Sequence, residues 1–219
     1  MFPVSDLVFD WYDVGATLVW AISGAMLAAR KGSDIVGIFV VAMVSATGGG
    51  LLRDGLFLHG GPPKLVETPT YLVTVAIATT LVVAFGRRLR TLRWLPLFLA
   101  LADAVGIGAY GVVGMTLAQQ AHLPALGIIL VGVVNAVGGS VLRDVLMGVQ
   151  PEVMRPGVLT ALASAMGCML FVGLLKLGMA SPWAGAASVA FVFLVRVLAL
   201  RFNLRTRALS AFEEDWRRP

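Results

Sequence analysis

"SATGGGLLRDGLF", residues 45–57, places three consecutive glycines and an Arg-Asp pair inside a long apolar segment. A closely similar stretch, "NAVGGSVLRDVLM", follows 90 positions later as residues 135–147. Glycine weakens a helix by up to about 1 kcal/mol relative to alanine, and charged side chains are costly within lipid. Because both unfavourable features recur together, we interpret them as functional in each half of the chain.

The composition is that of an integral membrane protein built from helices. The chain has 219 residues, of which 58% are hydrophobic and 13% charged, whereas soluble domains carry about 25% charged residues. The formal net charge of +5 comes from arginines at the ends of apolar blocks. There they set topology and contact membrane lipids, so nucleic acid is not an expected partner.

The apolar residues form blocks long enough to span a bilayer, which takes about 20 residues as a helix. We predict an all-α integral membrane fold with seven transmembrane helices in a single domain over residues 1–219. No loop is long enough to form a soluble domain, so function must reside among the helices. The predicted spans are residues 14–29, 35–58, 70–85, 95–118, 123–147, 157–177 and 182–200.

Sliding the sequence over itself by 90 positions reveals an internal repeat that needs no gap from Asp13 to Asp54. Repeat one covers about residues 11–90 and repeat two about residues 95–178. Each repeat holds three predicted helices, and three is odd, so the second copy enters the membrane from the opposite side. This predicts a 3+3 inverted repeat plus a seventh helix, followed by a basic tail at residues 201–219. The aligned pairs include Asp13 with Asp103, Trp20 with Tyr110, Ser45 with Asn135, Arg53 with Arg143 and Asp54 with Asp144.

Positive residues predict the orientation in the membrane. With seven spans, one set of helix ends carries most of the lysines and arginines, and the other set carries only Lys64 and Lys176. The positive-inside rule then places the N-terminus outside and the C-terminus in the cytoplasm. The expected location is the cell (inner) membrane.

The second and fifth predicted helices each present a stripe of small, slightly polar residues that ends in an arginine. Ser45, Gly49 and Arg53 lie four residues apart and share one helix face. The glycines make a bend easy, and a bend frees carbonyls that suit a monovalent cation such as K⁺ or Na⁺. The alternative reading is close helix packing through small residues. The predicted ion path comprises Ser45, Gly48, Gly49, Gly50, Asn135, Gly138, Gly139 and Ser140.

Six charged residues of the repeat form a predicted latch or gate. Arg53 and Arg143 are interpreted as latches near the two mouths, and Asp54 and Asp144 are expected to face polar edges. Structural ion pairs that hold bent helices are the alternative. Arg196, late in the last helix, is expected to snorkel inward. The six residues are Asp13, Arg53, Asp54, Asp103, Arg143 and Asp144.

No nucleophile-base set, metal motif or cofactor motif is visible, so we predict neither an enzyme nor a bound cofactor. The doubled signature in "GGGLLRDGLF" and "GGSVLRDVLMG", within a 3+3+1 membrane protein, resembles the prokaryotic trimeric intracellular cation (TRIC) channels. The resemblance implies a homotrimer with one pore inside each subunit, lined by glycine-kinked helices two and five and conducting potassium and sodium. Ser140 departs from a full triple glycine.

Two functions therefore stand beside each other at this point. The first is a monovalent-cation channel, with poor discrimination between K⁺ and Na⁺ because the sequence contains no filter-like carbonyl segment. The second is a secondary transporter of a small solute such as glycine, since an inverted repeat suits both. Related bacterial sequences are labelled glycine transporters, which keeps the second function in view.

Overall fold

The computed structural model describes residues 6–59, 61–89, 91–154 and 159–202, and these residues are almost entirely helical. The elements agree with the predicted spans to within a few residues at most ends. They are α1 (Asp6–Arg30), α2 (Ile35–Leu52), the π-helix η1 (Arg53–Leu58), α3 (Lys64–Glu67), α4 (Pro69–Leu89), α5 (Leu95–Gln120), α6 (Ala125–Leu146), the 3₁₀ turn η2 (Glu152–Met154), α7 (Thr160–Lys176) and α8 (Ser181–Phe202).

Five helical segments are long and apolar enough to cross a bilayer, and two shorter apolar helices accompany them. The five run over Ile35–Leu58, Pro69–Gly86, Leu95–Gln120, Ala125–Leu146 and Ser181–Phe202. The shorter ones are Val14–Arg30 and Thr160–Lys176. Large apolar side chains also cover the outside of the molecule, as expected of a surface that faces lipid. The all-α membrane fold is therefore confirmed, whereas the count of seven spans stays a prediction.

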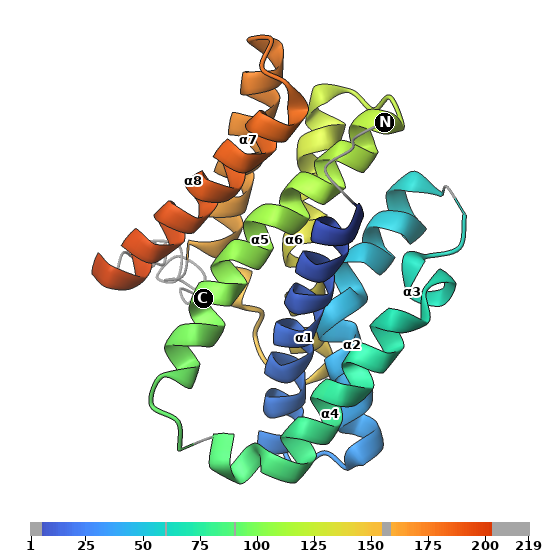
Figure 1. The fold of residues 1–219 in the computed structure, drawn as a ribbon, viewed down its shortest axis with the longest axis vertical. Helices are drawn as coiled ribbons and strands as arrows, with labels where there is room; N and C mark the ends of the chain where they lie inside the picture. The colour runs from blue at the N-terminus through green and yellow to red at the C-terminus, as the bar shows by residue number, and fades with distance from the viewer. Residues whose placement is uncertain (1–5, 60, 90, 155–158, 203–219) are drawn as a thin grey trace, which may run out of the picture.

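The long helices run alternately up and down the bundle (Figure 1). In Figure 1 α1 runs downward, α2 upward and α4 downward, whereas α5 runs upward, α6 downward and α7 upward. Within the first set α1 packs on α2 and α4, and within the second α6 packs on α5 and α7. The two sets meet where α2 packs on α6, while α8 lies against α5 and α7. These opposite directions are those that a 3+3 inverted repeat requires.

The central helices of the two sets are also buried in the same pattern. Residues 38–50 of α2 and residues 128–140 of α6 show an identical succession of buried, half-buried and exposed positions. The turns that precede them match as well, since Gly32 and His122, 90 positions apart, have φ angles of 80° and 56°. The repeat seen in the sequence thus extends to the burial of these helix residues and to the backbone of the turns before them.

The two halves differ where α2 ends. The chain continues from α2 into a π-helix, whereas α6 remains an α-helix to Leu146. His59, with φ 45°, follows η1, and Gly148, with φ 61°, ends the equivalent segment 89 rather than 90 positions later. A π-helical turn holds one extra residue, so η1 absorbs a one-residue insertion in the first half.

The glycines of helices two and five do not interrupt the helices, and the kinks expected there stay a prediction. α2 runs continuously through Gly48, Gly49 and Gly50, and α6 runs continuously through Gly138 and Gly139. The Gly49 and Gly50 carbonyls accept the backbone N–H of Arg53, so they are not released as ligands. Departure from the α-helix begins at η1, after the glycines.

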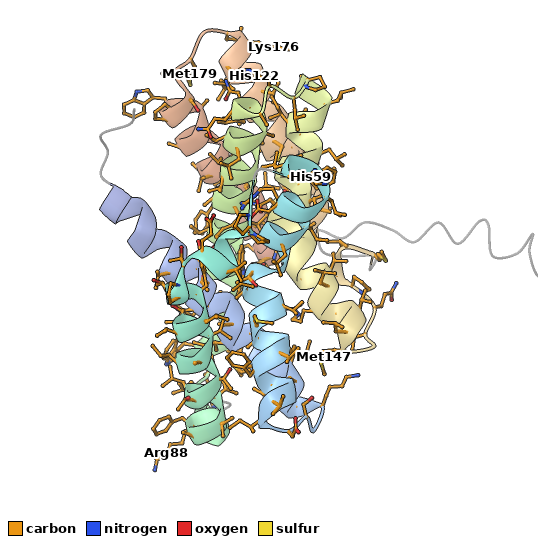
Figure 2. All side chains as sticks on the ribbon, turned by 90° about the vertical axis from the view of Figure 1, so that its right-hand side faces the viewer. His59, Arg88, His122, Met147, Lys176 and Met179 are labelled. Carbon is orange, nitrogen blue, oxygen red and sulfur yellow. The ribbon has the colours of Figure 1, made fainter. Side chains whose placement is uncertain are left out.

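Figure 2 shows labelled residues at the two ends of the bundle. Arg88 and Met147 lie toward one end, and His122, Lys176 and Met179 lie at the other. Arg88 belongs to the basic group of helix ends, and Lys176 belongs to the group with few positive charges. The assignment of the Arg88 end to the cytoplasm remains a prediction from the positive-inside rule.

Candidate functional site

The glycines of the repeated motif form the crossing of α2 and α6. A Cβ atom on Gly49 would collide with the carbonyl oxygen of Asn135, and one on Gly139 would lie 2.5 Å from the carbonyl oxygen of Ser45. The Cβ position of Gly48 lies 3.1 Å from the Cα of Gly139. Each helix therefore presses its glycines against the backbone of the other, which is the close packing that small residues allow in membranes.

The last residue of each glycine motif lies beside this contact rather than within it. A Cβ on Gly50 would meet only the Arg53 Nη2 atom, at 3.7 Å. Ser140, its counterpart, donates its hydroxyl to the carbonyl oxygen of Val137 at 2.8 Å. Gly50 and Ser140 are both half-buried and both line a cavity. The motif thus combines a packing segment with a residue at a cavity wall.

A cavity of about 380 Å³ lies on one side of the crossing. Its walls come from α1, α2, α5, α6 and α8, and η2 and the start of α7 also contribute. The predicted ion-path residues that line it are Ser45, Gly49, Gly50, Asn135, Gly139 and Ser140. The predicted gate residues that line it are Asp103, Arg143 and Asp144. Gly48 and Gly138 lie instead within the helix contact.

A second cavity, of about 50 Å³, lies beside Arg53 and Asp54. It shares Ala46, Gly50 and Tyr110 with the larger cavity. These three residues therefore form a wall between the two spaces.

Arg53 ties three elements together beside the smaller cavity. Its side chain is 6% exposed, and its Nε atom lies 2.6 Å from Oδ1 of Asp54. The Nη1 atom donates to Oδ1 of Asn135 at 3.2 Å, and Asn135 Nδ2 donates to the carbonyl oxygen of Tyr110 at 2.6 Å. The chain of bonds links η1 to α6 and α6 to α5, which suits a latch.

Arg143 makes the related arrangement beside the larger cavity. Its Nη2 atom lies 2.7 Å from Oδ1 of Asp144, and its Nη1 atom donates to Ser23 Oγ at 3.3 Å. The second oxygen of Asp144 accepts the backbone N–H of Glu152 at 3.2 Å, which fastens η2 to α6. Asp144 is buried and Asp54 half-buried. Each aspartate neutralises its neighbouring arginine, and Asp54 and Asp144 line the smaller and the larger cavity respectively.

A third ion pair, between Asp103 and Arg196, was not predicted from the sequence. Asp103 pairs with Arg196 of α8, with 3.1 Å between Oδ2 and Nη2, rather than with Arg143. Arg196 is buried, so the expectation that it snorkels inward is wrong. Trp20 donates its indole N–H to the other oxygen of Asp103 at 3.1 Å. A lone arginine inside an apolar helix was the available signal, but its partner lies 93 positions away.

Two acidic residues complete the account of the site. Glu152, on η2, also lines the larger cavity. Burial raises the pKa of its carboxyl above the usual value, and the nearby carboxylate of Asp103 raises the pKa further. Asp13 occupies the position equivalent to Asp103 on α1, but its side chain lies outside the described residues.

The helical bundle described above is similar in fold to solved structures of TRIC channels. One of these structures concerns conductance through TRIC cation channels. It has a TM-score of 0.83 and 29% sequence identity to this chain, and the match covers 92% of this chain and 97% of the other. A TRIC trimeric intracellular cation channel orthologue from Rhodobacter sphaeroides has a TM-score of 0.79 and 30% identity, with coverages of 90% and 99%.

Residues 10–87 and 100–176 match the model of the protein family described as Glycine transporter, and the chain belongs to this family. The second matched segment begins 90 positions after the first, which is the offset of the internal repeat. The chain is 38% identical over 159 residues to a UPF0126 membrane protein of Deinococcus radiodurans, covering 72% of each. It is 31% identical over 196 residues to the UPF0126 inner membrane protein YadS of Escherichia coli, covering 89% and 93%.

Proposed function

We propose that the protein is a monovalent-cation channel, permeable to K⁺ and Na⁺, with its conduction path inside each subunit along the crossing of α2 and α6. The observation that carries the proposal is the pair of charged cavities, which share the wall formed by Ala46, Gly50 and Tyr110. The fold shared with TRIC cation channels supports the same function. In this proposal the described arrangement is a closed path.

Opening requires the wall to part without loss of the helix contact. The contact between Gly48, Gly49, Gly138 and Gly139 is a pivot about which α2 and α6 can rotate, because glycine leaves the two backbones smooth at that point. The Arg53–Asn135 and Arg143–Ser23 hydrogen bonds act as latches on the two sides. Gly50 and Ser140, outside the tight contact, are the motif residues that face the passing ion.

The assembly and topology belong to the same proposal. The opposite directions of the two helix sets and their matched burial support an inverted repeat. The solved orthologue from Rhodobacter sphaeroides is described as trimeric, which supports a homotrimer with a path in each subunit. The uneven distribution of basic residues supports an outside N-terminus and a cytoplasmic C-terminus.

The test is single-channel recording of the purified protein in planar bilayers under a KCl gradient. We expect unitary currents whose reversal potential lies toward the K⁺ equilibrium potential, with K⁺ and Na⁺ passing at similar rates. Empty detergent-treated bilayers are the control. Unitary currents that reverse toward the Cl⁻ equilibrium potential would sink the proposal.

A secondary transporter of a small solute such as glycine is the second candidate, and one feature of the structure favours it. The cavities measure about 380 Å³ and 50 Å³, so the space on the two sides of the crossing is unequal, as expected of a transporter that opens to one side at a time. The family description points the same way. Saturable uptake of radiolabelled glycine into proteoliposomes, together with silent bilayers, would favour this candidate over the channel.

A further inference from the structure

Arg196 brings a positive charge to the larger cavity from outside both halves of the repeat. It lies on α8, and its side chain is 4% exposed. Its Nη2 atom lies 3.1 Å from Oδ2 of Asp103, and its Nη1 atom donates to Thr160 Oγ1 at 2.5 Å. A guanidinium held by two side chains in this way is a fixed charge rather than a mobile one.

The partner of Arg196 is open to the cavity. The side chain of Asp103 is 30% exposed, and its second oxygen accepts the indole N–H of Trp20 at 3.1 Å. Asp103 and Arg196 both line the cavity. A carboxylate in this position attracts passing cations, and the neighbouring guanidinium weakens that attraction.

The balance of charges on the wall shows how much depends on this pair. Three carboxylates, Asp103, Asp144 and Glu152, face two guanidiniums, Arg143 and Arg196. The formal balance is one negative charge when all five are ionised. Because Arg143 is already paired with Asp144, removal of Arg196 would leave Asp103 without its ion-pair partner.

We propose that Arg196 determines the cation preference of the channel, by acting as a built-in counter-charge on Asp103 in the larger cavity. The inference rests on the proposed channel function. It assigns a specificity-determining role to α8, the helix outside the repeat. Arg196→Gln leaves two net negative charges on the wall, whereas Asp103→Asn leaves none. The double variant returns the wall to one.

The expected size follows from Coulomb's law. A unit charge about 7 Å from a monovalent ion in water changes the local ion concentration roughly threefold. Because the Cl⁻ concentration changes by the inverse factor, we expect Arg196→Gln to raise the K⁺ over Cl⁻ permeability ratio roughly sevenfold and Asp103→Asn to lower it by a similar factor. The effect should shrink at high salt, because the Debye length falls from about 10 Å at 0.1 M to about 3 Å at 1 M.

The experiment measures reversal potentials of full-length protein in bilayers under KCl gradients at low and high salt. Arg196→Lys is the matched control, since it keeps the charge but loses the planar fork, and it should keep the wild-type permeability ratio. The double variant Arg196→Gln with Asp103→Asn should also return to that ratio. Recovery of selectivity by the double variant is a result that loss of packing alone would not produce.

The outcomes separate this inference from the channel proposal. Wild-type currents carried by anions would refute the channel itself. Cation currents with the same permeability ratio in wild type, Arg196→Gln and Asp103→Asn would overturn only the role of Arg196. If Arg196→Gln fails to elute as a single folded species, Asp103→Asn decides alone, and an unchanged ratio in that variant overturns the inference.

Discussion

Asn135 and Ser45 occupy equivalent positions of the two repeats, yet their side chains differ in reach. The Asn135 amide spans from Arg53 Nη1 on one side to the carbonyl oxygen of Tyr110 on the other. Serine has a single short hydroxyl and cannot span such a distance. Arg143 instead contacts Ser23 of α1. One substitution between repeats therefore gives the two latches different partners.

Glu152 provides a prediction at the same scale, because its raised pKa makes the larger cavity sensitive to pH. Burial raises the pKa of Glu152 above 4.5, and the carboxylates of Asp103 and Asp144 raise this pKa further. The guanidiniums of Arg196 and Arg143 oppose the rise. As pH falls through this raised pKa, Glu152 gains a proton and the wall loses a negative charge. We expect the K⁺ over Cl⁻ permeability ratio to fall between neutral pH and pH 4.5.

The variant that tests this prediction is Glu152→Gln. At neutral pH it should already show the low K⁺ over Cl⁻ permeability ratio that the natural protein reaches only in acid, and acidification should change this ratio little further. The stability of the fold changes with pH in the opposite direction to the permeability ratio. A carboxyl whose pKa is raised on folding favours the folded state below its unfolded pKa, and this contribution is lost as pH rises through the folded pKa. Identical pH profiles of the permeability ratio in wild type and Glu152→Gln would show that Glu152 does not act on the ion.

At the scale of elements, α2 and α6 form the core of the molecule because their glycines remove the side chains that would keep them apart. The close approach costs helix propensity, about 1 kcal/mol for each glycine relative to alanine. Backbone contact across the crossing offsets that cost through dispersion and tight packing. The main role of these glycines is therefore to let α2 and α6 pack closely. A rotation of one helix against the other would take place at the same contact.

The matched substitutions are Gly49→Ala within the contact and Gly50→Ala beside it. The added methyl of Gly49→Ala meets the Asn135 carbonyl oxygen, whereas that of Gly50→Ala meets only the end of Arg53 at 3.7 Å. Overpacking of this kind costs about 1–3 kcal/mol. We expect a lower melting temperature in detergent for Gly49→Ala and an unchanged or slightly higher one for Gly50→Ala. Equal melting temperatures would contradict the tight crossing.

At the scale of the whole molecule, the orientation in the membrane remains the main prediction to check. The single cysteine, Cys168, is 2% exposed within α7, so the natural chain offers a background with little thiol reactivity toward water-soluble reagents. Arg88→Cys and Lys176→Cys then mark the two ends of the bundle, which Figure 2 shows on opposite sides. Both positions are exposed.

In intact cells, a membrane-impermeant maleimide should label Lys176→Cys and leave Arg88→Cys unlabelled until the membrane is permeabilised. This follows from an outside N-terminus with the more basic ends in the cytoplasm. The parent chain with Cys168 alone is the control. Labelling of Arg88→Cys in intact cells, with protection of Lys176→Cys, would reverse the topology.

Several features could be predicted because they are recorded locally in the sequence. Helix ends follow from block length and from the glycine and proline turns, and the repeat follows from residue spacing alone. The π-helix at Arg53–Leu58 was not predicted. A one-residue insertion within an apolar run changes neither composition nor hydropathy, and only the offset of His59 from Gly148 reveals it.

The sequence by itself determined that this is a helical membrane protein with two similar halves, because hydrophobicity, charge placement and spacing are properties of the chain read in one dimension. The tertiary structure alone decided that the glycines pack rather than break, and that Asp103 pairs with Arg196 rather than Arg143. Both depend on which helix faces meet. In a membrane, packing and the need to pair buried charges select those faces.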